Sequence, residues 1–126
     1  MLFRSDRPPD RPVGWCNYGQ TTRLGGLLRR YGLEPADQEG IGSIACLTIA
    51  APYRGHGIAG RLVEAACDRL ASRGLRWVEA YPPRDPSGAV PSYRGSLELY
   101  RRHGFEPFRE AGRTVVMRRP LATDPG

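Results

Sequence analysis

The feature that most constrains this chain is an apolar stretch from Ile41 to Ala50, which a glycine-rich segment separates from an amphipathic stretch. The apolar stretch contains the β-branched residues Ile44, Thr48 and Ile49. Such a composition is typical of a strand that is buried on both faces. The sequence therefore predicts that residues 41–50 form the centre of a sheet with helices packed against it.

The segment after the glycines is predicted to be a helix that ends near Gly74, a natural C-cap residue. Its apolar face is formed by Ile58, Leu62, Ala65, Ala66 and Leu70. The other predicted elements are a hairpin of 1–3 with 12–18, a short helix within 20–40, a strand at 75–81, a helix at 92–103 and a hairpin of 105–108 with 114–118.

This order of elements predicts the α+β (mixed α/β) class, with a central, mostly antiparallel, twisted sheet flanked by helices. We expect a single domain over residues 1–126. Residues 1–11 are interpreted as a strand remnant and a turn, and residues 120–126 as a frayed tail.

Composition excludes several classes of protein. The chain lacks both a membrane-length apolar run and a secretory signal, so we expect a cytoplasmic protein. The cysteines Cys16, Cys46 and Cys67 have no metal-ligand spacing, so we expect neither a metal site nor a disulfide framework. All 19 basic residues are Arg, but they are scattered and accompany no nucleic-acid motif, so nucleic acid is a disfavoured partner despite the net charge of +6.

The glycine-rich segment Arg54–Arg61 lies between the central strand and the helix. A turn that leads into a helix N-terminus presents unpaired N–H groups and the positive end of the helix dipole, a combination that binds anions. The Lys-Ser/Thr pair of a P-loop and the acidic ribose ligand of a dinucleotide fold are both missing. In the alternative interpretation, Gly55, Gly57 and Gly60 only permit a tight turn and close packing.

The pattern Arg54-x-x-Gly57-x-Ala59, between a hydrophobic strand and an amphipathic helix, resembles the acyl-CoA signature of the GNAT N-acetyltransferase superfamily. Residues 13–16 resemble the strand that precedes the family's central strand. Residues 99–105, with the sequence Leu-Tyr-Arg-Arg-His-Gly-Phe, resemble its last helix and the Gly-Phe turn.

The resemblance implies an N-acetyltransferase that transfers an acetyl group from acetyl-CoA to a primary amine by direct attack in a ternary complex. It implies that the backbone of Leu47, Thr48 and Ile49 binds the pantetheine arm. It also implies that the pyrophosphate lies on the segment Arg54, Gly55, His56, Gly57, Ile58, Ala59, Gly60 and Arg61, where His56 can equally be a solvent-exposed loop residue.

The resemblance also suggests two catalytic residues. Tyr100 stands four residues before the Gly of the Gly-Phe turn, where the family often has its general acid, and packing in the core is the alternative. Glu79, on the strand after the long helix, is the candidate base, and a solvated surface residue is the alternative. Glu64 and Glu98 are interpreted as surface charges.

The chain departs from the family pattern in two ways. It has no room for the strand and two helices that usually come first, so we expect exposed apolar surface and self-association, for example as a homodimer. Tyr93 stands where the family usually has an Asn. Two other functions stay open at this stage, a catalytically inactive CoA-binding remnant and a small basic nucleic-acid-binding domain.

Overall fold

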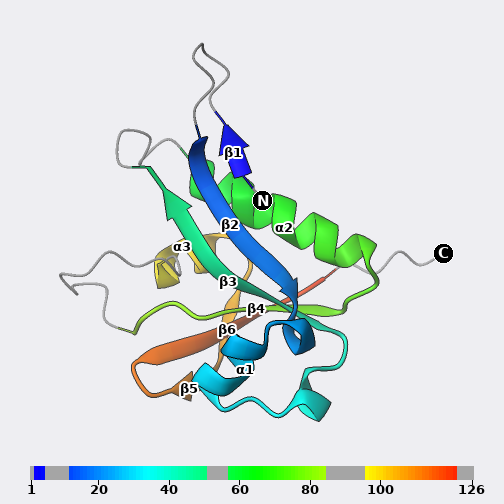
Figure 1. The fold of residues 1–126 in the computed structure, drawn as a ribbon. Helices are drawn as coiled ribbons and strands as arrows, with labels where there is room; N and C mark the ends of the chain where they lie inside the picture. Colours follow the sequence, from blue (N-terminus) through cyan, green and yellow to red (C-terminus); the bar gives the residue numbers. More distant parts are fainter. Residues whose placement is uncertain (1, 5–11, 51–56, 85–95, 122–126) are drawn as a thin grey trace.

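The computed structural model describes residues 2–4, 12–50, 57–84 and 96–121. Within these ranges the chain forms a six-stranded sheet in the order β1-β2-β3-β4-β6-β5 (Figure 1). The strands are β1 (Leu2–Arg4), β2 (Pro12–Gln20), β3 (Ile41–Ile49), β4 (Trp77–Ala80), β5 (Glu106–Ala111) and β6 (Thr114–Pro120). The helices are α1 (Gly25–Tyr31), α2 (Ile58–Ser72) and α3 (Leu97–Arg102), with short 3-10 turns η1 (Thr21–Arg23) and η2 (Pro35–Gln38).

Strand β3 lies inside the sheet, as its apolar composition predicted. It pairs antiparallel with β2 and parallel with β4, and α2 lies in the connection that a parallel pair requires. The pairs β1–β2, β4–β6 and β5–β6 are antiparallel. The predicted fold class is therefore confirmed: a mostly antiparallel sheet flanked by helices.

The main core lies between α2 and one face of the sheet. Leu62 and Leu70 of α2 are buried there together with Ile44 of β3 and Val78 of β4. The helix packs very closely at Gly42, where a β-carbon would lie 2.9 Å from both methyl carbons of Leu70. Glycine on β3 is therefore a packing requirement, because any side chain would push α2 away from the sheet.

The opposite face of the sheet is covered by the segment between β2 and β3, which the sequence had indicated as mostly a connection. Tyr31 of α1 stacks on Tyr81, with 4.6 Å between ring centroids and 9° between ring planes. Helix α1 ends at Gly32, whose positive φ of 62° suits glycine and closes the helix with a hydrogen bond to Leu28 O. Figure 1 shows α1 and α2 on opposite sides of the sheet.

Several predicted boundaries differ from the structure, and for two of them the contacts give the reason. Helix α3 begins at Leu97, because Ser96 is its N-cap and accepts a hydrogen bond from the Leu99 N–H at 3.1 Å. Residues 92–95, which the prediction assigned to this helix, lie outside the described residues, as does Tyr93. The predicted frayed tail, 120–126, is wrong for its first two residues, because Pro120 ends β6 and Leu121 is buried with its N–H donating to Arg76 O at 2.8 Å. Residues 122–126 lie outside the described residues.

Among the described helices, none combines the length and the apolar character needed to cross a membrane.

Gly42→Ala should lower the free energy of unfolding by about 1–3 kcal/mol, because the added methyl group overlaps Leu70. Gly26→Ala is the matched control: Gly26 lies in α1 with no atom within 4 Å of an added β-carbon, so alanine there should stabilise by about 0.5–1 kcal/mol. Urea unfolding measures both. Equal effects of the two substitutions would contradict the close packing at Gly42.

Candidate functional site

The strands β3 and β4 separate halfway along β3. Their parallel pairing runs from Ile41 beside Trp77 to Ile44 beside Ala80 and stops there. Beyond this point the chain after β4 follows β6, because the Val115 N–H donates to Pro82 O at 3.0 Å. The last part of β3 therefore has no neighbouring strand on this side among the described residues.

A β-bulge marks the same place on β3. Asn17 of β2 is paired with Cys46, whereas the next residue, Tyr18, is paired with Ile44, so Ala45 is an extra residue. A bulge bends its strand and increases its twist, which is why β3 diverges from β4 here. The bulge also places the end of β3 at an open edge of the sheet.

The three residues predicted to bind pantetheine, Leu47, Thr48 and Ile49, lie on this open part of β3. Leu47 is buried, and Thr48 and Ile49 are half-buried. The edge of a strand offers backbone N–H and C=O groups with which an extended ligand can pair as an additional strand. The geometry thus suits the predicted role, which stays a prediction.

The start of α2 supplies the second part of the candidate site. Gly57 is the N-cap with a φ of +77°, and its carbonyl accepts a hydrogen bond from the Arg61 N–H at 3.2 Å. The first turn of a helix has N–H groups with no acceptor within the helix, and the first turn of α2 contains no acidic residue. These N–H groups, at Ile58 and Ala59 among others, can bind an anion.

The remaining residues of the predicted pyrophosphate segment differ in what the structure shows of them. Arg54, Gly55 and His56 lie outside the described residues. Ile58 is buried in the core cluster, so only its backbone can face a ligand. Arg61 is exposed on the first turn of α2.

Tyr100, the predicted acid, is fully buried on the same side of the sheet as α2. Its ring packs edge-on against Phe105 with 5.0 Å between centroids, and it shares the core cluster with Leu47 and Cys16. Burial raises the pKa of the Tyr100 hydroxyl far above its ordinary value, because the phenolate would lose its hydration. The hydroxyl is therefore protonated at any working pH.

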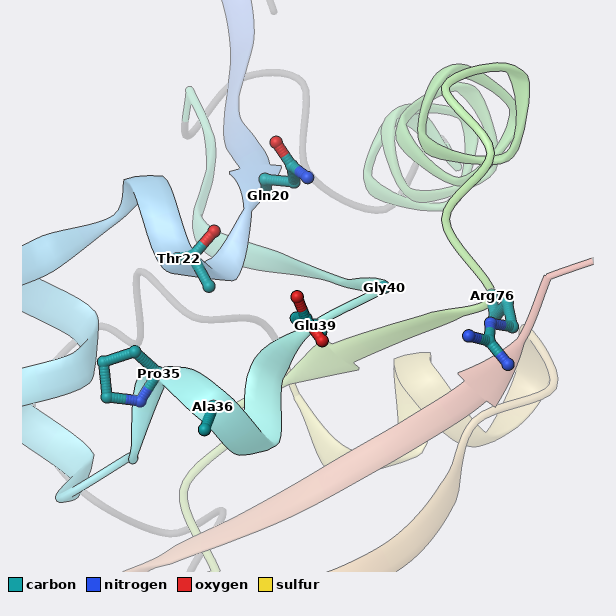
Figure 2. A pocket seen from close by; sticks show the side chains of 7 residues that line it. All are labelled: Gln20, Thr22, Pro35, Ala36, Glu39, Gly40 and Arg76. Atoms are coloured by element: carbon teal, nitrogen blue, oxygen red, sulfur yellow. The ribbon is translucent and has the colours of Figure 1, made fainter.

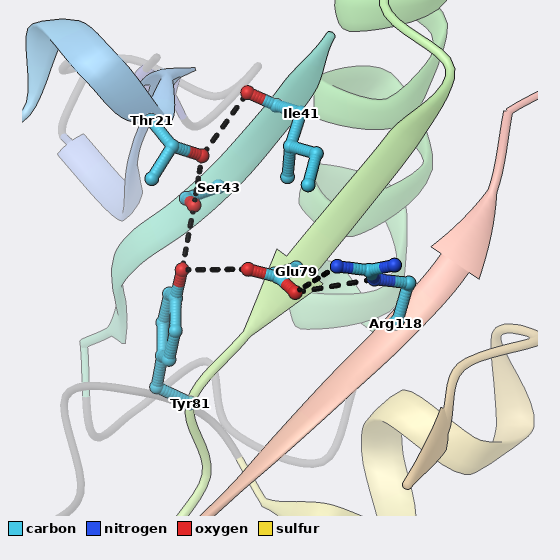
Figure 3. A network of polar contacts seen from close by, with 6 residues as sticks. All are labelled: Thr21, Ile41, Ser43, Glu79, Tyr81 and Arg118. Carbon is cyan, nitrogen blue, oxygen red and sulfur yellow. Dashed lines mark hydrogen bonds and ion pairs between the residues drawn. The ribbon is translucent and has the colours of Figure 1, made fainter. Parts of the chain in front are cut away.

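Glu79, the predicted base, lies on the opposite face, because it alternates along β4 with the core residues Val78 and Ala80. It is 1% exposed, so the interpretation as a solvated surface residue is wrong. The Nε and Nη2 atoms of Arg118 donate to its Oε2 at 3.1 and 2.8 Å (Figure 3). A buried carboxylate needs such a partner, and this ion pair joins β4 to β6.

A chain of hydroxyl groups continues from Glu79 toward β3, as Figure 3 shows. The Tyr81 hydroxyl lies 3.5 Å from Glu79 Oε1 and 2.7 Å from the Ser43 hydroxyl. The Ser43 hydroxyl lies 2.7 Å from that of Thr21, which also contacts Ile41 O at 3.0 Å. These three hydroxyls have three protons for four contacts, so the four contacts cannot all be hydrogen bonds at the same time. The contact in which the Tyr81 hydroxyl donates to Glu79 Oε1 is the longest of the four, at 3.5 Å.

Sequence reasoning missed this network. Glu79 and Tyr81 are two residues apart on a strand, which indicates a shared face. The partners Ser43 and Thr21 come from other elements, and only the register of β3 against β4 brings Ser43 beside Glu79.

Comparison with known proteins now identifies the family. The model of the acetyltransferase (GNAT) family matches residues 3–105. The chain belongs to this family. No curated protein sequence matches it significantly.

Solved structures of similar fold agree with this GNAT assignment. The NatC complex bound to Gag peptide and CoA matches with 27% identity and a TM-score of 0.52, covering 65% of this chain and 52% of that one. The ribosomal-protein-S18-alanine N-acetyltransferase from Escherichia coli matches with 12% identity and a TM-score of 0.61, covering 94% of this chain and 66% of that one. The IAA acetyltransferase from Bacillus cereus matches with 15% identity and a TM-score of 0.63, covering 88% of this chain and 71% of that one.

At 12% and 15% identity the last two show a shared fold alone. This GNAT chain spans between about half and about seven-tenths of the length of the three structures.

A second polar cluster joins α2 to α3 in this GNAT chain. Glu64 Oε1 accepts hydrogen bonds from His103 Nδ1 at 3.0 Å and from Arg119 Nη1 at 2.9 Å. Its side chain is 42% exposed, so the prediction of a surface charge is confirmed, but this charge is paired. Partial burial raises the pKa of Glu64, whereas the hydrogen bonds and charges of His103 and Arg119 together lower it by more, so the pKa is lowered overall. The resulting stability is present above the pH at which an unfolded Glu titrates and is lost as the pH falls through the lower pKa of the folded state.

A cavity of about 780 Å³ lies elsewhere (Figure 2). Its lining residues are Gln20, Thr22, Pro35, Ala36, Glu39, Gly40 and Arg76. Gly40 and Arg76 precede β3 and β4, so the cavity is at the end of these strands opposite to Leu47 and Ile49. It is therefore separate from the GNAT site.

Glu79→Gln should lower the free energy of unfolding by about 2–4 kcal/mol, because it leaves Arg118 without its charged partner in a mostly buried position. The control is Glu98→Gln, which breaks the exposed pair of Glu98 with Arg102 and should cost less than about 0.5 kcal/mol. Chemical denaturation compares the two. A loss at Glu79 no larger than that at Glu98 would show that the ion pair contributes little.

Proposed function

We propose that this chain is an N-acetyltransferase that transfers an acetyl group from acetyl-CoA to a primary amine by direct attack in a ternary complex. One observation carries the proposal: β3 loses its neighbour β4 at a bulge, and its open edge leads toward the start of α2. Membership of the GNAT family supports it. The comparison with NatC supports the choice of cofactor, because that complex is described as bound to CoA.

The residues present fit the two polar parts of acetyl-CoA. The first turn of α2 begins at a glycine and contains no acidic side chain, so phosphate oxygens can approach its N–H groups without steric or electrostatic conflict. Arg54 and Arg61 would add positive charge, and arginine suits phosphate well. The backbone of Leu47, Thr48 and Ile49 would hold the pantetheine arm. Acetyl-CoA supplies the thioester, and a strand N–H would stabilise the oxyanion that develops on it.

Tyr100 would protonate the departing thiolate. Its hydroxyl stays protonated because it is buried, and its ring lies in the same cluster as Leu47. The transfer would turn the thiolate into a thiol and leave a phenolate on Tyr100, which would regain a proton before the next turnover. The edge-on contact with Phe105 fixes the direction of the ring.

Glu79 would accept the proton of the attacking amine from the other face of the sheet. This division suits direct attack, because the amine and the departing sulfur occupy different sides of the tetrahedral carbon. Arg118 holds Glu79 Oε2, so the proton would reach Oε1 through the Tyr81 hydroxyl. The base role, the cytoplasmic location and the homodimer all stay predictions.

Gly57→Glu should abolish acetyl-CoA binding, because a carboxylate would occupy the place where phosphate meets the N–H groups of α2. Gly74→Glu is the matched control: Gly74 also has a positive φ and open space around it, but it lies beyond the other end of α2. Calorimetry measures both affinities. An unchanged affinity in a folded Gly57→Glu protein would remove the pyrophosphate assignment.

Tyr100→Phe should lower kcat roughly 10-fold to 1000-fold while the acetyl-CoA affinity changes little, because it keeps the packed ring and removes only the acid. The assay requires an amine that the wild type acetylates, chosen from polyamines, aminoglycosides, peptide N-termini and lysine. Equal losses of stability, affinity and kcat would assign Tyr100 to packing. Acetyl-CoA binding without turnover of any amine would instead favour the inactive CoA-binding remnant.

A further inference from the structure

His103 connects the helix of Tyr100 to the helix of the proposed pyrophosphate site. It is the C-cap residue of α3, and its N–H donates to Tyr100 O at 3.0 Å. Its Nδ1 is bonded to Glu64 of α2, and Glu64 is held in turn by Arg119 of β6. Three separate elements thus meet at one carboxylate oxygen.

The other side of the imidazole touches the backbone of α2. A β-carbon at Gly60 would lie 2.6 Å from His103 Nε2 and 2.9 Å from Cε1, so the ring occupies the space that a side chain would need. Gly60 is three residues after the N-cap Gly57, and a helix rises about 1.5 Å per residue, so the ring lies about one turn from the start of α2. Packing against His103 therefore requires glycine at position 60, in agreement with the alternative interpretation of this glycine as a packing residue.

We propose that His103 is a positioning residue of the acetyl-CoA site. It holds Tyr100 in register with the first turn of α2. When its imidazole is protonated, the positive charge strengthens the binding of the cofactor's phosphates. The inference rests on the proposed function. Helix α3 has only six residues, too few to be stable alone, so its position depends on contacts such as this one.

The charges around His103 determine the direction of the effect. Glu64 and Arg119 face it and compensate each other, with Asp68 and Cys67 further along α2. Burial raises the pKa of Cys67 to about 11, so its thiol is neutral near pH 7. Protonation of His103 therefore adds one positive charge about one turn from the bound phosphates. By linkage, a ligand with negative charge binds the protonated form more tightly.

The test compares acetyl-CoA dissociation constants from calorimetry for the wild type and His103→Asn between pH 5.5 and 8.5. Asparagine can still donate to Glu64 but carries no charge. We expect the ratio of mutant to wild-type Kd to be roughly three to ten at the acidic end of this range and smaller at the basic end, because only a protonated imidazole adds positive charge. The cofactor's own phosphates titrate equally in both measurements, so their effect on Kd cancels in the ratio.

Two further variants separate positioning from folding. Glu98→Gln, on the exposed side of the same helix, should give a ratio near one at every pH. Gly60→Ala, which displaces the ring, should weaken binding at pH 5.5 in the same sense as His103→Asn. Thermal unfolding of each variant identifies any that fails to fold, and in that case the other variant decides.

The amide resonance of Gly60 gives a readout that needs no cofactor. It should shift with the titration of imidazole in the wild type and not in His103→Asn. A Kd ratio that is the same at every pH overturns the inference, and so does a Gly60 amide resonance whose chemical shift does not change with pH. If the wild type binds no acetyl-CoA at any pH, the proposed function fails too, whereas binding with a constant ratio overturns the role of His103 alone.

Discussion

The separation of β3 from β4 is the constraint on which the candidate site depends. Their parallel pairing ends at Ile44 and Ala80, and the extra residue at Ala45 bends β3 where the neighbouring strand turns toward β6. An interior strand normally has all its backbone groups paired. Here the last residues of the central strand have no partner strand on the β4 side among the described residues, so the backbone of Leu47 and Thr48 is a candidate partner for an extended ligand. The start of α2, the candidate anion site, follows the same strand in the chain.

The two faces of the sheet have different surroundings. The side of α2 contains an apolar core in which burial keeps the Tyr100 hydroxyl neutral. The other side contains a polar network in which Arg118 compensates the charge of Glu79. These environments differ because β4 alternates between them, with Val78 and Ala80 on one face and Glu79 on the other. The two predicted catalytic residues, Tyr100 and Glu79, therefore lie on opposite faces of the sheet in different surroundings.

Much of the fold could be read from local patterns. The apolar stretch 41–50 and the spacing of Ile58, Leu62 and Leu70 are periodic over many residues, so neighbouring residues alone indicate a strand and a helix. The helix predicted at 92–103 starts earlier than α3, because a single hydroxyl, that of Ser96, sets where α3 begins. A cap of this kind leaves no periodic pattern in the sequence. Glu64 was interpreted as a surface charge because its partners His103 and Arg119 are 39 and 55 residues away.

The sequence by itself determined the class of fold, the central strand and the family, since each depends on residues that are close together along the chain. Only the tertiary structure decided that Glu79 is buried against Arg118, that Tyr31 covers Tyr81, and that His103 fills the space above Gly60. These facts depend on strand register and on the distance between helices. Register and helix distance are set by how all the side chains pack together, and no local pattern encodes them.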